Sequence, residues 1–195
     1  MNIDRPKSRQ PIPEHAKRVF TGVVFDVYQW EQRLYDSSIK TFEKVKRDDT
    51  IVVIPTLSDK RFIMEIDEQP SRTPIRTFPA GRMDHAGEND PLETAKRELL
   101  EETGYESSEW SLWRSFQPVT KVDWAVYIFV AKNCQKTSEP DPGPGEKITV
   151  ELKTFDEVIE LAKDSDFVAD DIRADLIESK YNPVTRKDLE KIFFG

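Results

Sequence analysis

The sequence has very little cysteine, a deficit of basic charge and no long apolar run. Cys134 is the only cysteine in 195 residues, which excludes an internal disulfide framework and a zinc site built from several cysteines. No apolar run approaches the roughly 18 residues that a membrane-spanning helix needs. The first residues lack an apolar stretch, so we expect no signal peptide and a soluble, cytoplasmic protein.

Acidic residues outnumber basic ones. Lys and Arg total 29 against 37 Asp and Glu, which gives a formal net charge of −8. Proteins that wrap nucleic acid or lie on anionic membranes need a basic surface, so we expect neither kind of partner. A ligand that carries phosphate would have to be bound through a local basic group or a bound cation. Hydrophobic residues make up 37% of the chain, enough for the core of one domain with a modest appendage.

The hydrophobic pattern predicts an α+β fold, without internal repeats. We expect a loose arm over residues 1–14, followed by strands rich in β-branched and aromatic residues and by helices interspersed among them. The expected strands cover residues 19–30, 39–46, 50–57, 62–67, 76–78, 110–118, 124–132 and 147–153. Besides the helix described next, helices are expected at residues 155–163, 169–179 and 185–194. Strands and helices in this irregular order are typical of α+β proteins.

The segment from Asp90 to Gly104 carries helix signals at both ends. Asp90 suits the N-cap position, and Pro91 suits the first helical position, where its missing N–H costs nothing. Gly104 suits the position just after the last helical residue. The apolar residues of the segment fall on one side, which we expect to face a core.

Three glutamates, Glu98, Glu101 and Glu102, border the apolar side of this helix within an arc of roughly 100°. Like charges at these spacings repel by roughly 0.2–0.5 kcal/mol per pair on an exposed helix. Arg97 precedes Glu101 by four residues, which is the weaker orientation for an ion pair. The cluster is therefore either a solvated face, as in many Glu-rich helices, or it is neutralised by cations. Hard divalent cations such as Mg²⁺ prefer such oxygen ligands.

The string from Ala80 to Tyr105 resembles the signature of the Nudix hydrolases, G-x5-E-x7-R-E-U-x-E-E-x-G-U, where U is a bulky aliphatic residue. The half that begins at Arg97, RELLEETG, matches position by position, and Tyr105 replaces the last aliphatic residue. Six residues separate Gly81 from Glu88 where the family has five, and eight separate Glu88 from Arg97 where it has seven. Both extra residues fall in the loop before the helix, where insertions cost little, so Gly81 and Glu88 are taken as the counterparts.

The resemblance implies a Nudix fold: a mixed β-sheet sandwiched between helices, here with an N-terminal antiparallel β-hairpin extension. It also implies hydrolysis of a nucleoside diphosphate linked to another group, with Mg²⁺ or Mn²⁺ and a water. In that family the counterparts of Glu98, Glu101 and Glu102 hold the metals, and the backbone carbonyl at Ala80 is a further ligand. The counterpart of Arg97 orients these carboxylates.

The rest of the chain is similar to the ADP-ribose pyrophosphatase branch of the family. The similarity lies in the N-terminal hairpin, the PAG tripeptide before the signature, and the loop that leads into EKITVELKTFDEVIELA. In that branch a carboxylate in this loop is the catalytic base or an extra metal ligand. Glu146 is the first candidate, with Glu139 and Asp141 as second choices, and an ordinary solvated acid is the alternative for Glu146.

The substrate stays open at this point, because residues 117–124 match the turn of that branch poorly. ADP-ribose or a similar nucleotide sugar is the leading substrate, and a dinucleotide or a damaged nucleoside triphosphate is the alternative. A non-catalytic Nudix-fold regulator that binds nucleotides is a third possibility. The predicted partner in each case is a small-molecule nucleotide.

A few further residues are candidates for contact with the substrate. Arg72, in the proline-bearing loop before the signature, is predicted with Gly81 and Glu88 as a substrate-binding residue, against the alternative of a surface arginine. Three further residues are weaker candidates than these. Trp124 or Tyr28 would stack on a base unless they are core aromatics, and His85 would reach the diphosphate unless it is simply exposed.

The branch also commonly exchanges its N-terminal sheet between two subunits, so the resemblance implies a homodimer. We expect an N-terminal arm and hairpin over residues 1–46, with the dimer contact in residues 19–46. A Nudix hydrolase domain with C-terminal helices is expected over residues 47–195.

Overall fold

The computed structural model describes residues 3–84 and 90–195, and it has two small sheets at its centre. The first sheet is mixed and has the strand order β7-β4-β11-β9. Its strands are β4 (Thr50–Pro55), β7 (Ala80–Arg82), β9 (Glu109–Phe116) and β11 (Val126–Lys132). β4 and β11 run parallel, and the other two pairs are antiparallel. The order therefore places the short strand β7 beside the buried strand β4.

The second sheet is antiparallel and has the strand order β13-β5-β6. Its strands are β5 (Phe62–Glu68), β6 (Ile75–Thr77) and β13 (Lys147–Lys153). A third pairing joins two strands of two residues, β8 (Tyr105–Glu106) and β12 (Gln135–Lys136). β5 is the middle strand of its sheet, so its side chains have neighbours on both sides.

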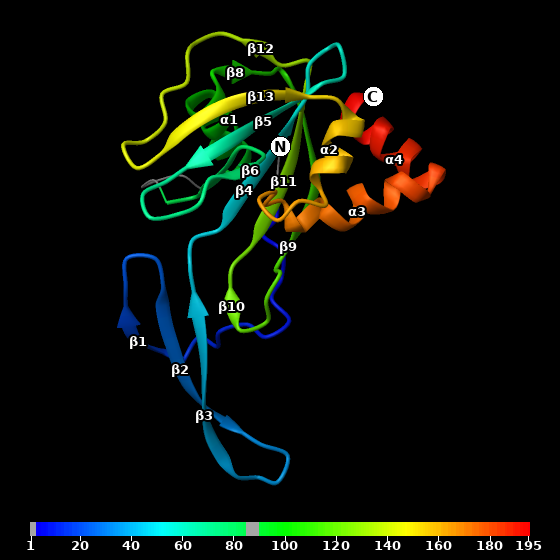
Figure 1. The fold of residues 1–195 in the computed structure, drawn as a ribbon. Helices are drawn as coiled ribbons and strands as arrows, with labels where there is room; N and C mark the ends of the chain where they lie inside the picture. Colours follow the sequence, from blue (N-terminus) through cyan, green and yellow to red (C-terminus); the bar gives the residue numbers. More distant parts are fainter. Residues whose placement is uncertain (1–2, 85–89) are drawn as a thin grey trace.

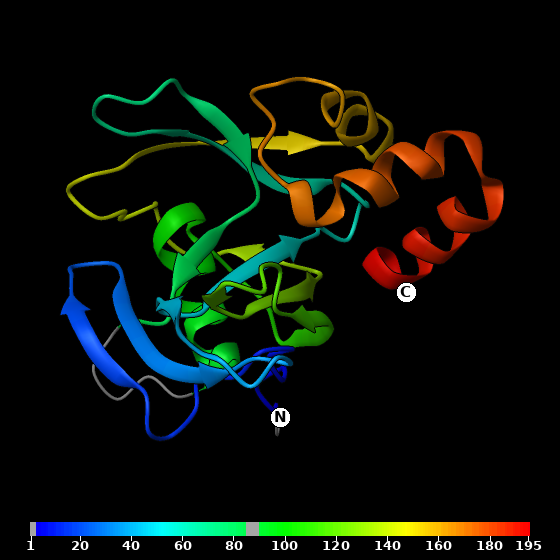
Figure 2. The same cartoon turned by 90° about the horizontal axis from the view of Figure 1, so that it is seen from below.

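Helices cover both faces of the mixed sheet (Figures 1 and 2). The sheet lies between α1 (Pro91–Thr103) on one side and three C-terminal helices on the other. These are α2 (Phe155–Leu161), α3 (Asp170–Tyr181) and α4 (Pro183–Phe194). Along β4, Ile51 and Val53 pack with residues of α1, whereas Ile54 packs with residues of α2, α3 and α4. This alternation is the period of two that a strand buried on both faces shows. The predicted α+β class and the mixed sheet between helices are confirmed.

The N-terminal strands form a hairpin that projects from the two sheets (Figure 1). The strand order is β1-β2-β3-β10, with β1 (Lys17–Thr21), β2 (Asp26–Arg33), β3 (Ile39–Lys46) and β10 (Val122–Asp123). The single strand expected over residues 19–30 is wrong, because the chain reverses after β1. The backbone N–H of Gly22 donates to the carbonyl of Phe25 at 2.9 Å and closes a turn between β1 and β2.

The loose arm expected over residues 1–14 is also wrong for the part that the structure describes, residues 3–14. The Arg5 guanidinium pairs with Asp49 at 2.7 Å. The side chain of Lys44 is 1% exposed, and its Nζ donates to the Ser8 hydroxyl at 2.7 Å. Composition suggested a loose segment, but these long-range polar contacts attach it to the hairpin.

The other expected strands and helices begin and end close to the predicted residues, whereas the short strands β7, β8, β10 and β12 were not expected. β3 and β13 coincide with the expected strands at residues 39–46 and 147–153, and each C-terminal helix lies within two residues of its expected bounds. Within residues 3–84 and 90–195, no helix is long and apolar enough to cross a membrane.

Candidate active site

The helix α1 has the ends that its sequence predicts. The Asp90 carboxylate accepts a hydrogen bond from the N–H of Leu92 at 2.9 Å, which satisfies one of the free donors of the first turn. Gly104 has a φ of 74° and its N–H donates to the carbonyl of Leu100. A left-handed residue of this kind is most easily a glycine. The two ends of α1 are therefore defined by Asp90 and Gly104, and the side of the helix on which its glutamates lie follows from helical spacing.

The strand β7 lies directly against these glutamates. A Cβ on Gly81 would lie 1.9 Å from Oε1 of Glu98, so only glycine leaves room for the carboxylate there. The backbone N–H of Ala80 donates to Oε2 of Glu102 at 3.0 Å. The structure thus brings together the alanine–glycine pair and two of the three glutamates of the predicted metal site.

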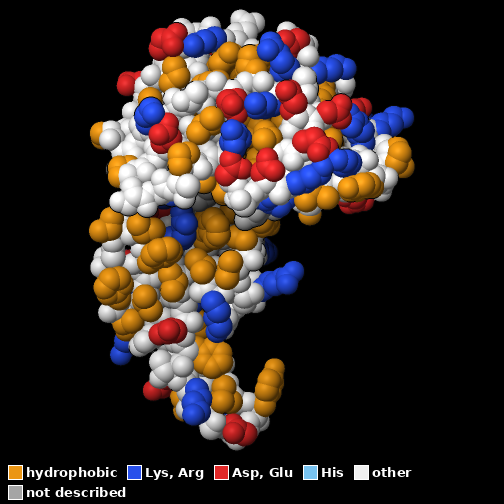
Figure 3. Space-filling model, viewed as in Figure 1, with side chains coloured by type: hydrophobic (Ala, Val, Ile, Leu, Met, Phe, Trp, Pro, Cys, Tyr) orange, Lys and Arg blue, Asp and Glu red, His pale blue; other side chains and the backbone are white. Residues whose placement is uncertain are grey.

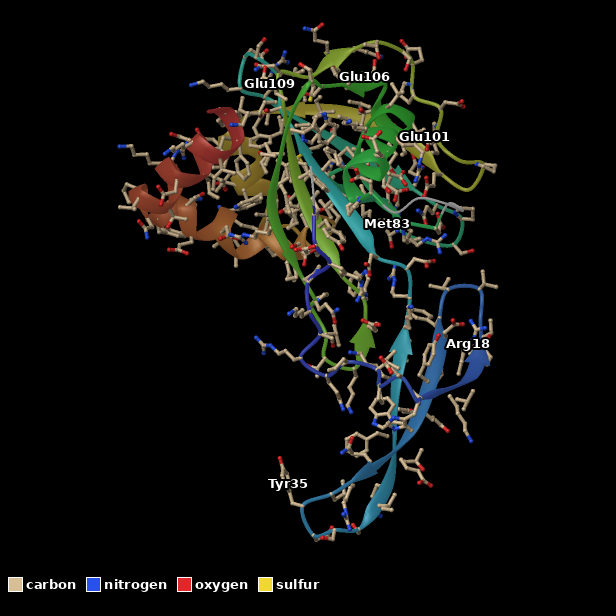
Figure 4. The ribbon with its side chains drawn as sticks, turned by 180° about the vertical axis from the view of Figure 1, so that it is seen from behind. Arg18, Tyr35, Met83, Glu101, Glu106 and Glu109 are labelled. Atoms are coloured by element: carbon tan, nitrogen blue, oxygen red, sulfur yellow. The ribbon has the colours of Figure 1, made fainter. Side chains whose placement is uncertain are left out.

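Arg97 contacts Glu98 and also the third glutamate of the predicted set, Glu101. Its NH2 lies 2.9 Å from Oε1 of Glu98, and its NH1 lies 2.8 Å from Oε2 of Glu101. The side chain of Glu98 is 13% exposed, whereas that of Glu101 is 44% exposed. Glu102 is 6% exposed, so Glu102 is buried, Glu98 is partly buried and Glu101 lies at the rim, where Figure 4 labels it on α1. An arginine that orients the two carboxylates would make these contacts. The orienting role of Arg97 stays a prediction.

Two more carboxylates reach this place from β5, and sequence reasoning missed them. Ile63 of β5 packs in the core beneath α1, so the alternating residues Glu65 and Asp67 share that face of the strand. Glu65 is 2% exposed, and Oε2 of Glu65 and Oδ1 of Asp67 are buried without a hydrogen-bond partner among the described residues. The available signal was the strand sequence FIMEIDE, in which acids alternate with apolar residues although both faces are covered.

Burial, and after it the crowding of these carboxylates, raises their pKa values. Burial raises the pKa of Glu102 to about 11, and the charges of Glu65 and Glu98 add to this, while the Ala80 N–H opposes it. Burial raises the pKa of Glu65 to about 8, with further contributions from Asp67, Glu146 and Glu98. Burial also raises the pKa of Glu98, against the opposing charge of Arg97. Ionising these carboxyls together would therefore place more negative charge in the site than its neighbouring residues compensate.

Glu146 belongs to the same cluster. Nε2 of Gln69 donates to Oε1 of Glu146 and to Oδ2 of Asp67, both at 3.2 Å, and so links the loop before β13 to the end of β5. Loss of hydration and then the charge of Asp67 raise the pKa of the Glu146 carboxyl. Its charge in turn raises the pKa values of Glu65 and Glu102.

The two second-choice acids of that loop have other contacts. Glu139 is exposed and its carboxylate pairs with Lys136 at 3.1 Å. The backbone N–H of Asp141 donates to the carbonyl of Glu101 at 2.7 Å, which fixes the loop over the C-terminal part of α1. Among the three loop acids, Glu146 is therefore the one whose charge acts on the buried glutamates.

The three predicted substrate-binding residues differ in where they lie. The Arg72 guanidinium pairs with Asp67, and its side chain is 38% exposed, so it lies at the edge of the cluster. Gly81 lies inside the site, against Glu98. Glu88 and His85 lie outside the described residues.

The two aromatic candidates for base stacking have other contacts in the structure. The guanidinium carbon of Arg47 is 4.8 Å from the centroid of the Trp124 ring, so one face of this ring is already covered. The Trp124 indole N–H donates to the Thr50 hydroxyl at 2.9 Å. Tyr28 is half-buried on β2 in the hairpin. Stacking by either residue stays a prediction.

The chemistry of this donor set fits a hard divalent cation. Mg²⁺ and Mn²⁺ prefer carboxylate and carbonyl oxygens, and buried carboxylates without positive partners need neutralisation. In the part of the chain that the structure describes, no three His, Cys, Asp or Glu side chains are already arranged around one ion position. Arg97 holds Glu98 and Glu101, so these side chains would have to turn towards an ion.

A comparison with family models identifies the class. Residues 46–176 match the model described as the NUDIX domain. The match covers more than half of the chain, and the chain therefore belongs to the NUDIX domain family. The predicted Nudix fold and the prediction of a Nudix hydrolase are confirmed.

The chain is similar to curated relatives and to solved structures. It is 31% identical over 154 residues to the methanol dehydrogenase activator of Bacillus methanolicus, which covers 76% of this chain and 81% of the relative. It is 28% identical over 125 residues to the ADP-ribose pyrophosphatase of Bacillus subtilis (strain 168), covering 63% of this chain and 66% of that one. A crystal structure described as an ADP compounds hydrolase has a TM-score of 0.71 at 18% identity, over 95% of this chain and 96% of that chain. The predicted position near the ADP-ribose pyrophosphatase branch is confirmed.

Proposed function

We propose that this chain hydrolyses the pyrophosphate bond of ADP-ribose or a similar nucleotide sugar, with Mg²⁺ or Mn²⁺ as cofactor. The products would be AMP and a sugar phosphate. The observation that carries the proposal is the packing of the buried Glu102 and the partly buried Glu98 against the Ala80–Gly81 strand, where ionising both carboxyls calls for a cation. The Bacillus subtilis relative, an ADP-ribose pyrophosphatase, supports the choice of substrate.

Glu98, Glu102 and the Ala80 carbonyl would hold the cation, with Glu101 as a further ligand from the rim. When bound, a divalent cation neutralises charge on the diphosphate and activates a water for attack at phosphorus. Arg97 would keep the carboxylates of Glu98 and Glu101 oriented through its two ion pairs.

Glu146 is the proposed general base. Its raised pKa brings the carboxylate closer to the pH range in which a base accepts a proton from water efficiently. Gln69 holds Oε1 of Glu146 at 3.2 Å, which leaves the other carboxylate oxygen for the water. Arg72 lies beside Asp67 at the edge of the same cluster and would contact a phosphate or the ribose.

The proposal is tested by incubating the protein with Mg²⁺ and a panel of nucleotides that contains ADP-ribose, nucleotide sugars, dinucleotides and nucleoside triphosphates. We expect AMP and ribose 5-phosphate from ADP-ribose, and loss of this activity in Glu102→Gln. Glu93→Gln is the matched control, because Glu93 lies on the same helix with its side chain 62% exposed. Pyrophosphate release from triphosphates alone would instead identify the alternative substrate class.

A second candidate function is the regulation of another enzyme. It is favoured by the 31% identity to the methanol dehydrogenase activator. If the protein regulates by binding alone, the wild type and Glu102→Gln would stimulate a methanol dehydrogenase to the same degree. A regulator that acts through hydrolysis would lose this stimulation with the carboxylate.

We also propose a homodimer that forms through residues 19–46. All residues of the edge strand β1 are exposed, and Phe20, Val23 and Ile39 are 58%, 99% and 60% exposed. Figure 3 shows hydrophobic side chains gathered over this part of the molecule. An unpaired edge strand with exposed apolar residues favours pairing with a second chain. The division at residue 46 and the cytoplasmic location stay predictions.

A further inference from the structure

Glu65 occupies a position where the strand pattern calls for an apolar residue. It is in β5, the middle strand of its sheet, with Val150 of β13 and Thr77 of β6 as its cross-strand neighbours. Ile63 precedes it on the same face, and Val150 packs against the same apolar cluster beneath α1. Glu65 therefore lies at the boundary between this core and the carboxylates of α1.

Among the residues that the structure describes, the Glu65 carboxylate has no compensating partner. Its side chain is almost completely buried, and its Oε2 accepts no hydrogen bond among the described residues. No ion pair joins Glu65 or Glu102 to a lysine or arginine within residues 3–84 and 90–195. Burying an uncompensated carboxylate costs several kcal/mol, so a residue of this kind is expected where something neutralises it.

The surroundings of the Glu65 side chain indicate what would neutralise its carboxylate. Glu65 shares its face of β5 with Ile63, which lies in one buried cluster with Leu99 of α1, so its carboxylate faces the part of α1 that carries Glu98 and Glu102. Thr77, opposite Glu65, is three residues before Ala80, whose N–H holds Glu102. The strand β5 thus supplies a carboxylate to the same region as α1 and β7.

We propose that Glu65 is a further ligand of the divalent cation, or of a water bound to it, at the site formed by Glu98, Glu102 and the Ala80 carbonyl. This inference rests on the metal dependence in the proposed function. It adds to the signature helix an oxygen ligand from a different sheet, which would fix the cation between α1 and β5. A carboxylate on each side gives a more rigid site than a cluster on one flexible helix face.

The test is a direct measurement of cation binding by Mn²⁺ electron paramagnetic resonance, with Mg²⁺ competition, on wild type and Glu65→Gln. We expect the dissociation constant of Mn²⁺ to rise at least about tenfold in Glu65→Gln, as for the loss of other oriented groups around a metal. Glu65→Leu, which continues the apolar surface of Ile63 and Val150, is expected to lose affinity to the same degree. Melting of both variants without metal shows that they are folded.

The matched control is Glu68→Gln on the same strand. Glu68 alternates to the other face from Glu65 and its carboxylate pairs with Lys147 at 2.7 Å, with the side chain 39% exposed. Its Mn²⁺ affinity should equal that of wild type within a factor of about two. Equal affinity of folded Glu65→Gln and wild type would overturn the inference and leave Glu65 as a protonated neighbour of Glu102. Absence of saturable Mn²⁺ binding to wild type would overturn it as well.

Cation binding and nucleotide hydrolysis are measured in separate assays, so the two proposals can fail independently. If wild type binds Mn²⁺ through Glu65 but hydrolyses no nucleotide of the panel, the proposed function fails and the ligand role of Glu65 stands. If ADP-ribose is hydrolysed and Glu65→Gln binds Mn²⁺ like wild type, the function stands and the role of Glu65 fails.

Discussion

Replacement of Glu102 by glutamine is expected to stabilise the metal-free protein while it removes activity. Glu102 is 6% exposed, and burial together with the charge of Glu65 raises its pKa from an ordinary 4.5 to about 11. Glutamine keeps the size of the side chain and an oxygen that can accept the hydrogen bond from Ala80. It removes the ionisable group and with it the repulsion inside the cluster.

The sign and size of the effect follow from proton binding. Between pH 4.5 and the raised pKa, the unfolded chain releases the Glu102 proton and the folded chain retains it. The free energy of unfolding of the metal-free protein therefore falls as pH rises, by up to about 1.4 kcal/mol per pH unit for this group. From about pH 5 to about pH 8 the loss is at most about 4 kcal/mol, and sharing of charge with Glu65 makes the measured loss smaller.

Urea unfolding in a metal chelator at several pH values measures this effect. Wild type should lose stability as pH rises from 5 to 8, whereas Glu102→Gln should lose less and be the more stable of the two at pH 8. Added Mg²⁺ should stabilise wild type more than the variant, because a cation that binds the folded state stabilises it. A variant that is less stable than wild type at pH 8 without metal would refute the reasoning, since it would show that the buried carboxylate stabilises the fold.

Three other changes test separate parts of the structure. Gly81→Ala places a Cβ 1.9 Å from the Glu98 carboxylate, so hydrolysis should fall at least about tenfold while the melting temperature changes little, because that side chain can move. Gly104→Ala puts an alanine at a φ of 74° with its Cβ 2.2 Å from a backbone oxygen, and urea unfolding should show a loss of more than about 1 kcal/mol. Val23→Glu should halve the mass measured by light scattering if the hairpin forms the dimer; a wild-type monomer would contradict the dimer and leave the enzyme proposal intact.

The helix signals were readable from the sequence because they are local. Asp90, Pro91 and Gly104 each act within one turn of their own position, and the structure has α1 between the residues they mark. The side of α1 on which Glu98 and Glu102 lie also follows from helical spacing alone. This part of the candidate site was therefore predictable in detail.

The rest of the site depends on tertiary contacts that the sequence pattern does not reveal. The pattern predicted a strand that contains Glu65, but which sheet and which face it belongs to depends on pairing with β6 and β13. A carboxylate on a strand is usually solvated, so only the tertiary structure shows that this one is buried against α1. Gln69 likewise becomes a link between Asp67 and Glu146 only when the ends of β5 and the loop meet.

The same reason explains the errors in the N-terminal region. Prolines and charges predicted a loose arm, whereas Arg5 and the buried Lys44 attach it through partners more than thirty residues away in sequence. The β-branched residues after Lys17 predicted one long strand, because a turn closed by Gly22 and Phe25 has no strong signal when Val23 and Val24 form its centre. Figure 4 shows the consequence, with Arg18 on a separate edge strand and Tyr35 at the far tip of the hairpin.

The most direct test of the central claim is a crystal structure with Mn²⁺ and a non-hydrolysable ADP-ribose analogue, with the ion located by its anomalous scattering. We expect anomalous density between α1 and the Ala80 carbonyl, within bonding distance of Glu98 and Glu102, with the diphosphate of the analogue against it. Clear density for the analogue with no manganese at these carboxylates would contradict the account.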